Sequence, residues 1–147
     1  MLELSRLRWW HIEQLVAIED ELFGAEAWTA AMFWSELASG HYYRAAFEAG
    51  ELLGYAGLAL TADEAWVNNI AVRATARRRG IASALLTDLL RRAERAGVER
   101  VALEVAVDNA GAQRLYDRFG FDGIAIRKGY YQPSNTDAVV MMKELQR

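Results

Sequence analysis

The sequence predicts one α+β domain built on a mixed, mostly antiparallel β-sheet. Its 147 residues, of which 53% are hydrophobic and 25% charged, fit a single globular domain spanning residues 1–147 with a sizeable core. Runs with strand composition alternate with segments of helical spacing, and one long helical segment separates two strand-like runs. That strand–helix–strand unit implies a parallel pair with a right-handed crossover, whereas a short glycine-containing connection elsewhere implies an antiparallel hairpin.

The first 40 residues predict a short strand, Leu2–Leu7, and two helices. In the segment Trp9–Phe23 apolar residues recur at helical spacing, and we expect its acidic residues to face outward. The apolar positions are Ile12, Leu15, Val16, Leu22 and Phe23, and the acidic ones are Glu13, Glu19, Asp20 and Glu21. Thr29 suits the N-cap of a second helix, which Gly40 ends.

Three strands are expected next, in the runs 42–47, 52–60 and 66–72. The connection between the first two, Glu48-Ala-Gly-Glu51, is typical of an antiparallel hairpin. Asn68 and Asn69 are unusual in the third run, because asparagine is poorly suited to a strand interior. A β-bulge, a polar contact with a ligand, or a strand exposed on one face would each explain them.

The second half predicts two helices and three strands. Ile81–Ala96 is the clearest helix, with an apolar stripe, arginines toward its C-terminal end and Gly97 as its stop. Val98–Val107 alternates as a strand, and Asn109 with Asp108 can cap a helix that runs to Phe119. Two further strands, 121–127 and 138–145, complete the sheet, so that about four helices flank it.

Charge is distributed unevenly along the chain. Residues 1–70 hold 11 acidic and 3 basic side chains, a net charge of −8, whereas residues 71–147 hold 9 acidic and 14 basic, a net charge of +5. An anionic cofactor bound by the second half and a cationic partner bound by the first would fit this pattern, and so would a solvated acidic helical face. The overall charge of −3 disfavours direct binding of nucleic acid.

Several other classes of site are not indicated. The chain has no cysteine and only two histidines, far apart in sequence, so we expect no metal site and no thiolate nucleophile. A secretory signal peptide and an apolar run of about 18 residues are also missing. We therefore expect a soluble, cytoplasmic protein without membrane contact, and a monomer.

The loop before the long helix predicts an anion site. Free backbone N–H groups at a helix N-terminus and the positive end of the helix dipole favour a phosphate. Arg77, Arg78 and Arg79 add positive charge there, and Gly80 lets the backbone approach a ligand closely. The pattern is neither a Walker loop nor the dinucleotide G-x-G-x-x-G. The alternative is a surface loop whose arginines are simply solvated.

Glu104 is the first candidate for chemistry. It lies in the middle of an apolar strand that, as the second member of a parallel pair, should be buried. A carboxylate there is costly unless it is paired or near water, and desolvation would suit it to act as a general base. The alternative is that the face carrying Glu104 opens to solvent. Taken singly, Tyr116 suits a core tyrosine with its hydroxyl at the edge, and Asn109 a helix cap.

The combination of these motifs is more specific than any one of them. R-x-x-G-x-A at Arg77–Ala82, L-E-V at Leu103–Val105 and N-x-x-A-x-x-L-Y-x-x-x-G-F at Asn109–Phe121 together resemble the GNAT N-acetyltransferase superfamily. The segments Ile126–Tyr131 and Asp137–Met142 resemble its RimI branch, the ribosomal-protein-alanine N-acetyltransferases. The resemblance covers nearly the whole chain. One departure is Ala25-Glu-Ala-Trp28, where RimI-type proteins tend to carry a proline.

The resemblance implies a GNAT-type fold with a central splayed parallel strand pair, and a role for each matching residue. Glu104 would be the proton acceptor and Tyr116 the proton donor. Acetyl-CoA would lie along the backbone of one strand and against the following loop, in contact with Ile70, Ala71, Val72, Arg77, Arg78, Arg79, Gly80, Ile81, Ala82, Ser83 and Asn109. On the acceptor side we expect Trp28, Tyr130 and Tyr131.

The implied reaction is transfer of acetyl from acetyl-CoA to a protein N-terminal α-amine, that of an alanine on a small-subunit ribosomal protein. An α-amine titrates near pH 8, well below lysine, so a modest base suffices, and no metal is required. Two alternatives remain open. One is a GNAT enzyme acting on a small-molecule amine or a lysine side chain, and the other is a non-catalytic acyl-CoA-binding module.

Overall fold

The computed structural model describes residues 1–145, so the last two residues of the predicted 1–147 domain lie outside it. Seven strands form one sheet in the order β1-β2-β3-β4-β5-β7-β6. Their bounds are β1 Leu2–Arg6, β2 Tyr42–Glu48, β3 Glu51–Leu60, β4 Glu64–Val72, β5 Arg100–Ala106, β6 Asp122–Tyr131 and β7 Thr136–Glu144. The four α-helices in this part of the chain are α1 Ile12–Phe23, α2 Ala30–Ala38, α3 Ile81–Ala96 and α4 Ala110–Arg118.

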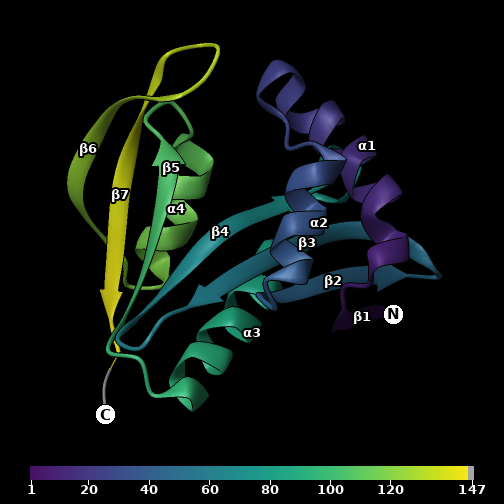
Figure 1. Cartoon of the computed structure of the whole chain (residues 1–147), viewed down its shortest axis with the longest axis horizontal. Helices are drawn as coiled ribbons and strands as arrows, with labels where there is room; N and C mark the ends of the chain where they lie inside the picture. Colours follow the sequence, from purple (N-terminus) through teal and green to yellow (C-terminus); the bar gives the residue numbers. More distant parts are fainter. Residues whose placement is uncertain (146–147) are drawn as a thin grey trace.

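The predicted mixed, mostly antiparallel sheet with a splayed parallel pair is confirmed. β4 and β5 run parallel and pair only from Glu64 with Arg100 to Val67 with Leu103. Beyond that point β4 continues to pair with β3 and β5 with β7, and both of these pairings are antiparallel. The two central strands therefore separate midway, and their backbones leave an opening in the sheet (Figure 1).

The helices cover both faces of the sheet and define two hydrophobic cores. On one face α3 and α4 pack against the sheet around residues such as Leu85, Leu89 and Leu103. On the other face α1 and α2 pack around Leu15 and Phe33. Figure 1 shows α1 and α2 in front of β2, β3 and β4, with α3 beneath the same strands. Both faces of the sheet are thus covered by helices.

Local signals set the helix ends as expected. α3 has the predicted bounds, and Gly97 closes it in the left-handed conformation with φ 76°. The Thr29 hydroxyl accepts the backbone N–H of Met32 at 3.3 Å and so caps α2. The Asn109 side chain accepts the backbone N–H of Ala112 at 3.1 Å and caps α4. A 3-10 turn, Trp9–His11, replaces the first turn of the predicted first helix.

The asparagines of β4 mark a β-bulge. Leu58 pairs with Val67 and Gly57 pairs with Asn69, so Asn68 has no partner residue on β3. Gly57, which faces the bulge, must be a glycine, because a side chain there would collide with the ring of Tyr43. Of the three explanations left open by the sequence, the bulge is observed, and Asn68 is also exposed. The bulge changes the direction of β4 immediately after Val67, the last residue of β4 that pairs with β5.

The prediction for two residues of α1 was wrong. Glu19 does not face outward, because it is only 2% exposed and lies among the buried residues of the helix. Phe23, expected in the apolar stripe, is 43% exposed. β6 also continues to Tyr131, four residues past its predicted end, which places Tyr130 and Tyr131 in a strand. Within residues 1–145 no helix is long and apolar enough to cross a membrane.

Candidate active site

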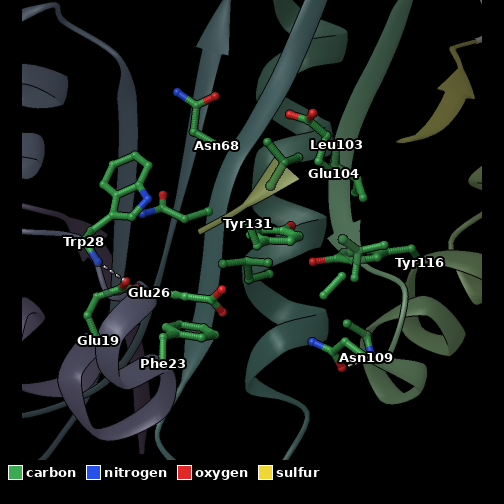
Figure 2. A pocket seen from close by; sticks show the side chains of 16 residues that line it. Glu19, Phe23, Glu26, Trp28, Asn68, Leu103, Glu104, Asn109, Tyr116 and Tyr131 are labelled. Atoms are coloured by element: carbon green, nitrogen blue, oxygen red, sulfur yellow. Dashed lines mark hydrogen bonds between the residues drawn. The ribbon is translucent and has the colours of Figure 1, made fainter. Parts of the chain in front are cut away.

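A cavity of about 200 Å³ lies where β4 and β5 separate. Residues 67–70 of β4 form one wall and residues 103–106 of β5 the other, and α4 closes one end. The end of α1 and the segment before α2 close the other end. Figure 2 shows Glu19, Glu26 and Trp28 on one side of this cavity and Asn109 and Tyr116 on the opposite side.

Glu104 lies at the β5 wall of the cavity, where sequence analysis predicted a general base. Its side chain is 14% exposed, and Arg127 Nε on β6 lies 2.9 Å from its Oε2 atom. Arg127 itself is 54% exposed, so the counter-ion reaches Glu104 from the solvent side. The carboxylate thus has a charge partner and also lines an open space. The pairing with Arg127 meets the condition under which a carboxylate can lie in an apolar strand.

Tyr116 projects from α4 into the same cavity, with its hydroxyl toward the open space (Figure 2). The residue is 5% exposed, and its ring meets the ring of Phe121 edge-on. Burial is the main cause that raises the pKa of Tyr116, and the nearby Tyr131 contributes. The phenol therefore stays protonated at neutral pH and can donate a proton.

A second hollow of about 410 Å³ lies between the loop before α3 and helix α4. It is lined by Val72, Arg77, Arg78, Gly80, Ile81, Ala82, Ser83, Gly111, Leu115 and Arg118. Arg78 and Gly80 both have positive φ, 65° and 76°, and a Cβ placed on Gly80 would meet nothing within 4 Å. The backbone that leads into α3 is therefore open on this side, as an anion ligand requires.

Two of the residues predicted to bind the cofactor, Arg79 and Ala71, do not line the hollow or the central cavity. Arg79 turns away from this hollow and pairs with Glu48 of β2 at 2.5 Å. Ala71 is 6% exposed and its side chain belongs to the core under α1 and α2, which leaves only its backbone for a ligand. Ile70 lines the central cavity and Val72 lines the second hollow, so β4 runs from one to the other.

A groove on the other side of the central cavity joins the residues expected to bind the acceptor. Trp28, Tyr130 and Tyr131 all line this groove, whose volume is about 690 Å³. Glu104 and Tyr131 line both the groove and the central cavity. Burial is the main cause that raises the pKa of Tyr131, to about 12, so this phenol is neutral at physiological pH. Glu104 stands between the groove and the cavity, and Tyr116 lies deeper.

Glu19 lies in the site, although the sequence did not predict it there. Its carboxylate lines the central cavity and accepts the backbone N–H of Trp28 at 2.8 Å as well as the hydroxyl of Tyr55. Burial is the main cause that raises the pKa of Glu19, to about 7; the bond from Trp28 lowers it and the neighbouring Asp20 raises it. Its spacing gave a usable signal, because Glu19 lies four residues after Leu15 on the buried face of α1.

Glu26 is a second acidic group that sequence analysis did not assign. It lies in the turn after α1, and its Oε2 atom accepts the hydroxyl and the backbone N–H of Ser134, which follows β6. The two loops meet at one end of the molecule (Figure 1). With Glu19 and Glu104, Glu26 gives the cavity three carboxylates, and no lysine or arginine of the described residues lines it. A cationic group is therefore favoured there.

The chain belongs to the GNAT acetyltransferase family. A family model described as Acetyltransferase (GNAT) family matches residues 4–121, which include the whole splayed pair, α3 and α4. The predicted family is thereby confirmed, and its members use acetyl-CoA as the acetyl donor.

Several similar proteins are named as RimI-type enzymes. N-alpha-acetyltransferase RimI of Mycobacterium tuberculosis is 38% identical over 138 residues, which make up 90% of this chain and 85% of the relative. The [ribosomal protein bS18]-alanine N-acetyltransferase of Escherichia coli K12 is 32% identical over 134 residues, 90% of this chain and 86% of the relative. A crystal structure of the Escherichia coli ribosomal-protein-S18-alanine N-acetyltransferase superposes with a TM-score of 0.91 at 30% identity, covering 100% of this chain and 96% of that one.

Proposed function

We propose that this GNAT acetyltransferase transfers the acetyl group of acetyl-CoA to the N-terminal α-amine of ribosomal protein bS18, whose first residue is alanine. The observation that carries the proposal is the placement of Glu104 and Tyr116 on one cavity at the splayed strand pair. The hollow beside Arg77 and Arg78 lies to one side of that cavity, and the groove beside Tyr131 lies to the other.

The donor is assigned to the side of α3 and α4. Arg77, Arg78 and the open backbone before Ile81 suit the pyrophosphate, and the unpaired edge of β4 around Ile70 suits the chain that carries the thioester. Asn109 lines the central cavity beside this path, although its side-chain oxygen also caps α4.

The chemistry needs one base and one acid. The amine nitrogen attacks the thioester carbonyl carbon, the C–S bond breaks, and an amide and free CoA result. Glu104, which lines both the groove and the cavity, accepts the proton that the amine loses, directly or through water. Tyr116 returns a proton to the departing sulfur, since its phenol is neutral at the pH of the reaction.

The choice of acceptor rests on three supports. Relatives at 32–38% identity bear RimI-type names, and those named for a substrate act on the alanine of bS18. The acidic lining of the cavity suits the positively charged N-terminus of a peptide. An α-amine loses its proton near pH 8, more than two units below a lysine side chain, so a carboxylate base is sufficient for it.

The test is a product assay with a peptide that copies the first residues of bS18 and begins with alanine. Incubation with acetyl-CoA should release free CoA and raise the peptide mass by one acetyl group. The same peptide with a blocked N-terminus is the control and should not react. Turnover of a small-molecule amine with none of the peptide would reject the acceptor, and binding of acetyl-CoA without any turnover would reject catalysis.

A further inference from the structure

Glu19 is a buried carboxylate that the proposed chemistry does not use. It lies in the last turn of α1 and is 2% exposed, yet its side chain lines the central cavity. Burial of a carboxylate is costly unless hydrogen bonds compensate for the water that it loses. The partners of Glu19 therefore indicate what the residue does in the fold.

Those partners come from two other elements. One carboxylate oxygen accepts the backbone N–H of Trp28, which lies two residues before α2, at 2.8 Å (Figure 2). The other oxygen accepts the hydroxyl of Tyr55, a fully buried residue in the middle of β3. Glu19 thus joins the end of α1, the entrance of α2 and the central sheet through one side chain.

Ring contacts also connect Trp28 to Tyr55 through Phe33. The ring of Trp28 lies 5.3 Å from that of Phe33 on α2, and the ring of Phe33 meets that of Tyr55 at 5.7 Å in a T-shaped arrangement. Glu19 therefore contacts both ends of this chain of rings: it accepts the backbone N–H of Trp28 and the hydroxyl of Tyr55. Trp28 is held at both its backbone and its side chain.

We propose that Glu19 is a positioning residue for the acceptor: its ionised carboxylate holds Trp28, and with it the acceptor wall of the cavity, against the sheet. The inference rests on the proposed function, because it takes the groove beside Trp28 as the path of the acceptor amine. Glu19 acts through Trp28 and accepts no proton from the amine.

The groups around Glu19 make its hydrogen bond with the Trp28 N–H depend on pH. Its own helix supplies Asp20, and the sheet supplies Tyr55 and Tyr43, the latter donating to Glu36 of α2. Glu26 lies on the same side of the cavity as Glu19, and Glu104, Tyr116 and Tyr131 also line it. None of the described lining residues is a lysine, an arginine or a histidine. Burial raises the pKa of Glu19 to about 7. A rise in pH through neutrality therefore creates the charged form, which accepts the Trp28 N–H more strongly.

The first test compares Glu19→Ala with Glu13→Gln, a change that removes the charge of an exposed carboxylate on the same helix. Glu19→Ala should raise the KM for the alanine-initiated peptide about tenfold, equivalent to about 1.4 kcal/mol. Its kcat should stay within about threefold and its KM for acetyl-CoA should be unchanged. Glu13→Gln should match the parent in all three constants.

The second test uses Glu19→Gln, which keeps the shape and an acceptor oxygen but cannot ionise, so it also covers the case in which Glu19→Ala does not fold. The ratio of its peptide KM to that of the parent should rise about fivefold between pH 6 and pH 8, because the Glu19 carboxylate of the parent becomes mostly ionised over this range. Tyr55→Phe, which keeps the ring contact with Phe33 and loses the bond to Glu19, should raise the peptide KM in the same direction.

A third readout does not depend on the acceptor. Hydrogen exchange of the Trp28 amide, measured without peptide at one pH, should be at least about tenfold faster in Glu19→Ala than in the parent and Glu13→Gln. If the peptide is not a substrate at all, the proposed function fails while this readout still decides the role of Glu19. Unchanged Trp28 exchange would overturn the inference. So would a loss of kcat at constant peptide KM, which is the behaviour of a proton-transfer residue.

Discussion

Glu104 and Arg127 form an ion pair across neighbouring parts of the sheet, with Arg127 Nε 2.9 Å from Glu104 Oε2. The pair is asymmetric, because the Glu104 side chain is 14% exposed and that of Arg127 is 54% exposed. The arginine comes from β6, the edge strand beyond β7, and reaches in from solvent. This arrangement keeps a carboxylate in the middle of an otherwise apolar strand without closing the cavity that it lines.

Glu104→Gln should lower kcat by about 10²–10⁴-fold, since it removes the base and preserves the shape of the side chain. The KM for acetyl-CoA should change little, because the proposed donor site lies beside the loop before α3. Steady-state kinetics with both substrates measure this. Asp122→Asn, an exposed carboxylate at the start of β6, is the control. Activity of Glu104→Gln within about twofold of the parent would show that Glu104 is not the general base.

Tyr116→Phe should lower kcat by about 10²-fold or more, because it removes the proton for the departing sulfur and retains the buried ring. The melting temperature should fall only slightly, as the edge contact with Phe121 is preserved. Since burial raises the pKa of Tyr116, the parent should show no alkaline loss of kcat below about pH 10 from this group. A pH profile of kcat, recorded for parent and variant, checks both statements.

Arg77→Ala and Arg78→Ala should each weaken the binding of acetyl-CoA, by about tenfold, and the loss should shrink at high salt. Both side chains line the hollow before α3. Arg79→Ala should have a smaller effect, within about threefold, because Arg79 is engaged by Glu48. Titration calorimetry at two ionic strengths distinguishes these outcomes. Equal losses for all three arginines would show that the loop acts as a general patch of charge.

Glu19→Gln should make the protein more stable than the parent at alkaline pH. Burial raises the folded-state pKa of Glu19 from 4.5 to about 7, so the folded state binds the proton more tightly than the unfolded state. The stability that this proton contributes is complete below about pH 4.5 and is lost as pH rises through about 7. The advantage of Glu19→Gln should therefore grow from pH 5 to pH 8, by roughly 1–3 kcal/mol. Denaturant unfolding at several pH values measures it, and a constant difference would contradict it.

Much of the fold could be predicted because its signals are local. The spacing of Ile81, Leu85 and Leu89 and the stop at Gly97 gave α3 its observed bounds, and Thr29 and Asn109 act as the caps expected of them. The parallel pair followed from the length of the strand–helix–strand unit. Helix caps and apolar periodicity need no tertiary information, which is why these predictions hold.

The unpredicted part of the site depends on contacts between distant segments. Glu19 looked exposed because it heads an acidic run, and its partners Trp28 and Tyr55 lie 9 and 36 residues away. Arg127 was part of a motif but could not be paired with Glu104 until the order β5-β7-β6 was known. The link from Glu26 to Ser134 spans 108 residues. No periodicity in a single sequence encodes such pairs.

The most direct test of acetylation at the N-terminal α-amine is to locate the acetyl group on a peptide that has two amines. The peptide copies the bS18 N-terminus, begins with alanine and carries an internal lysine, and the product is fragmented in a mass spectrometer after incubation with acetyl-CoA. We expect acetyl on the alanine α-amine of the parent's product, and its loss in Glu104→Gln. Acetyl on the lysine side chain alone, or equal labelling by parent and Glu104→Gln, would contradict it.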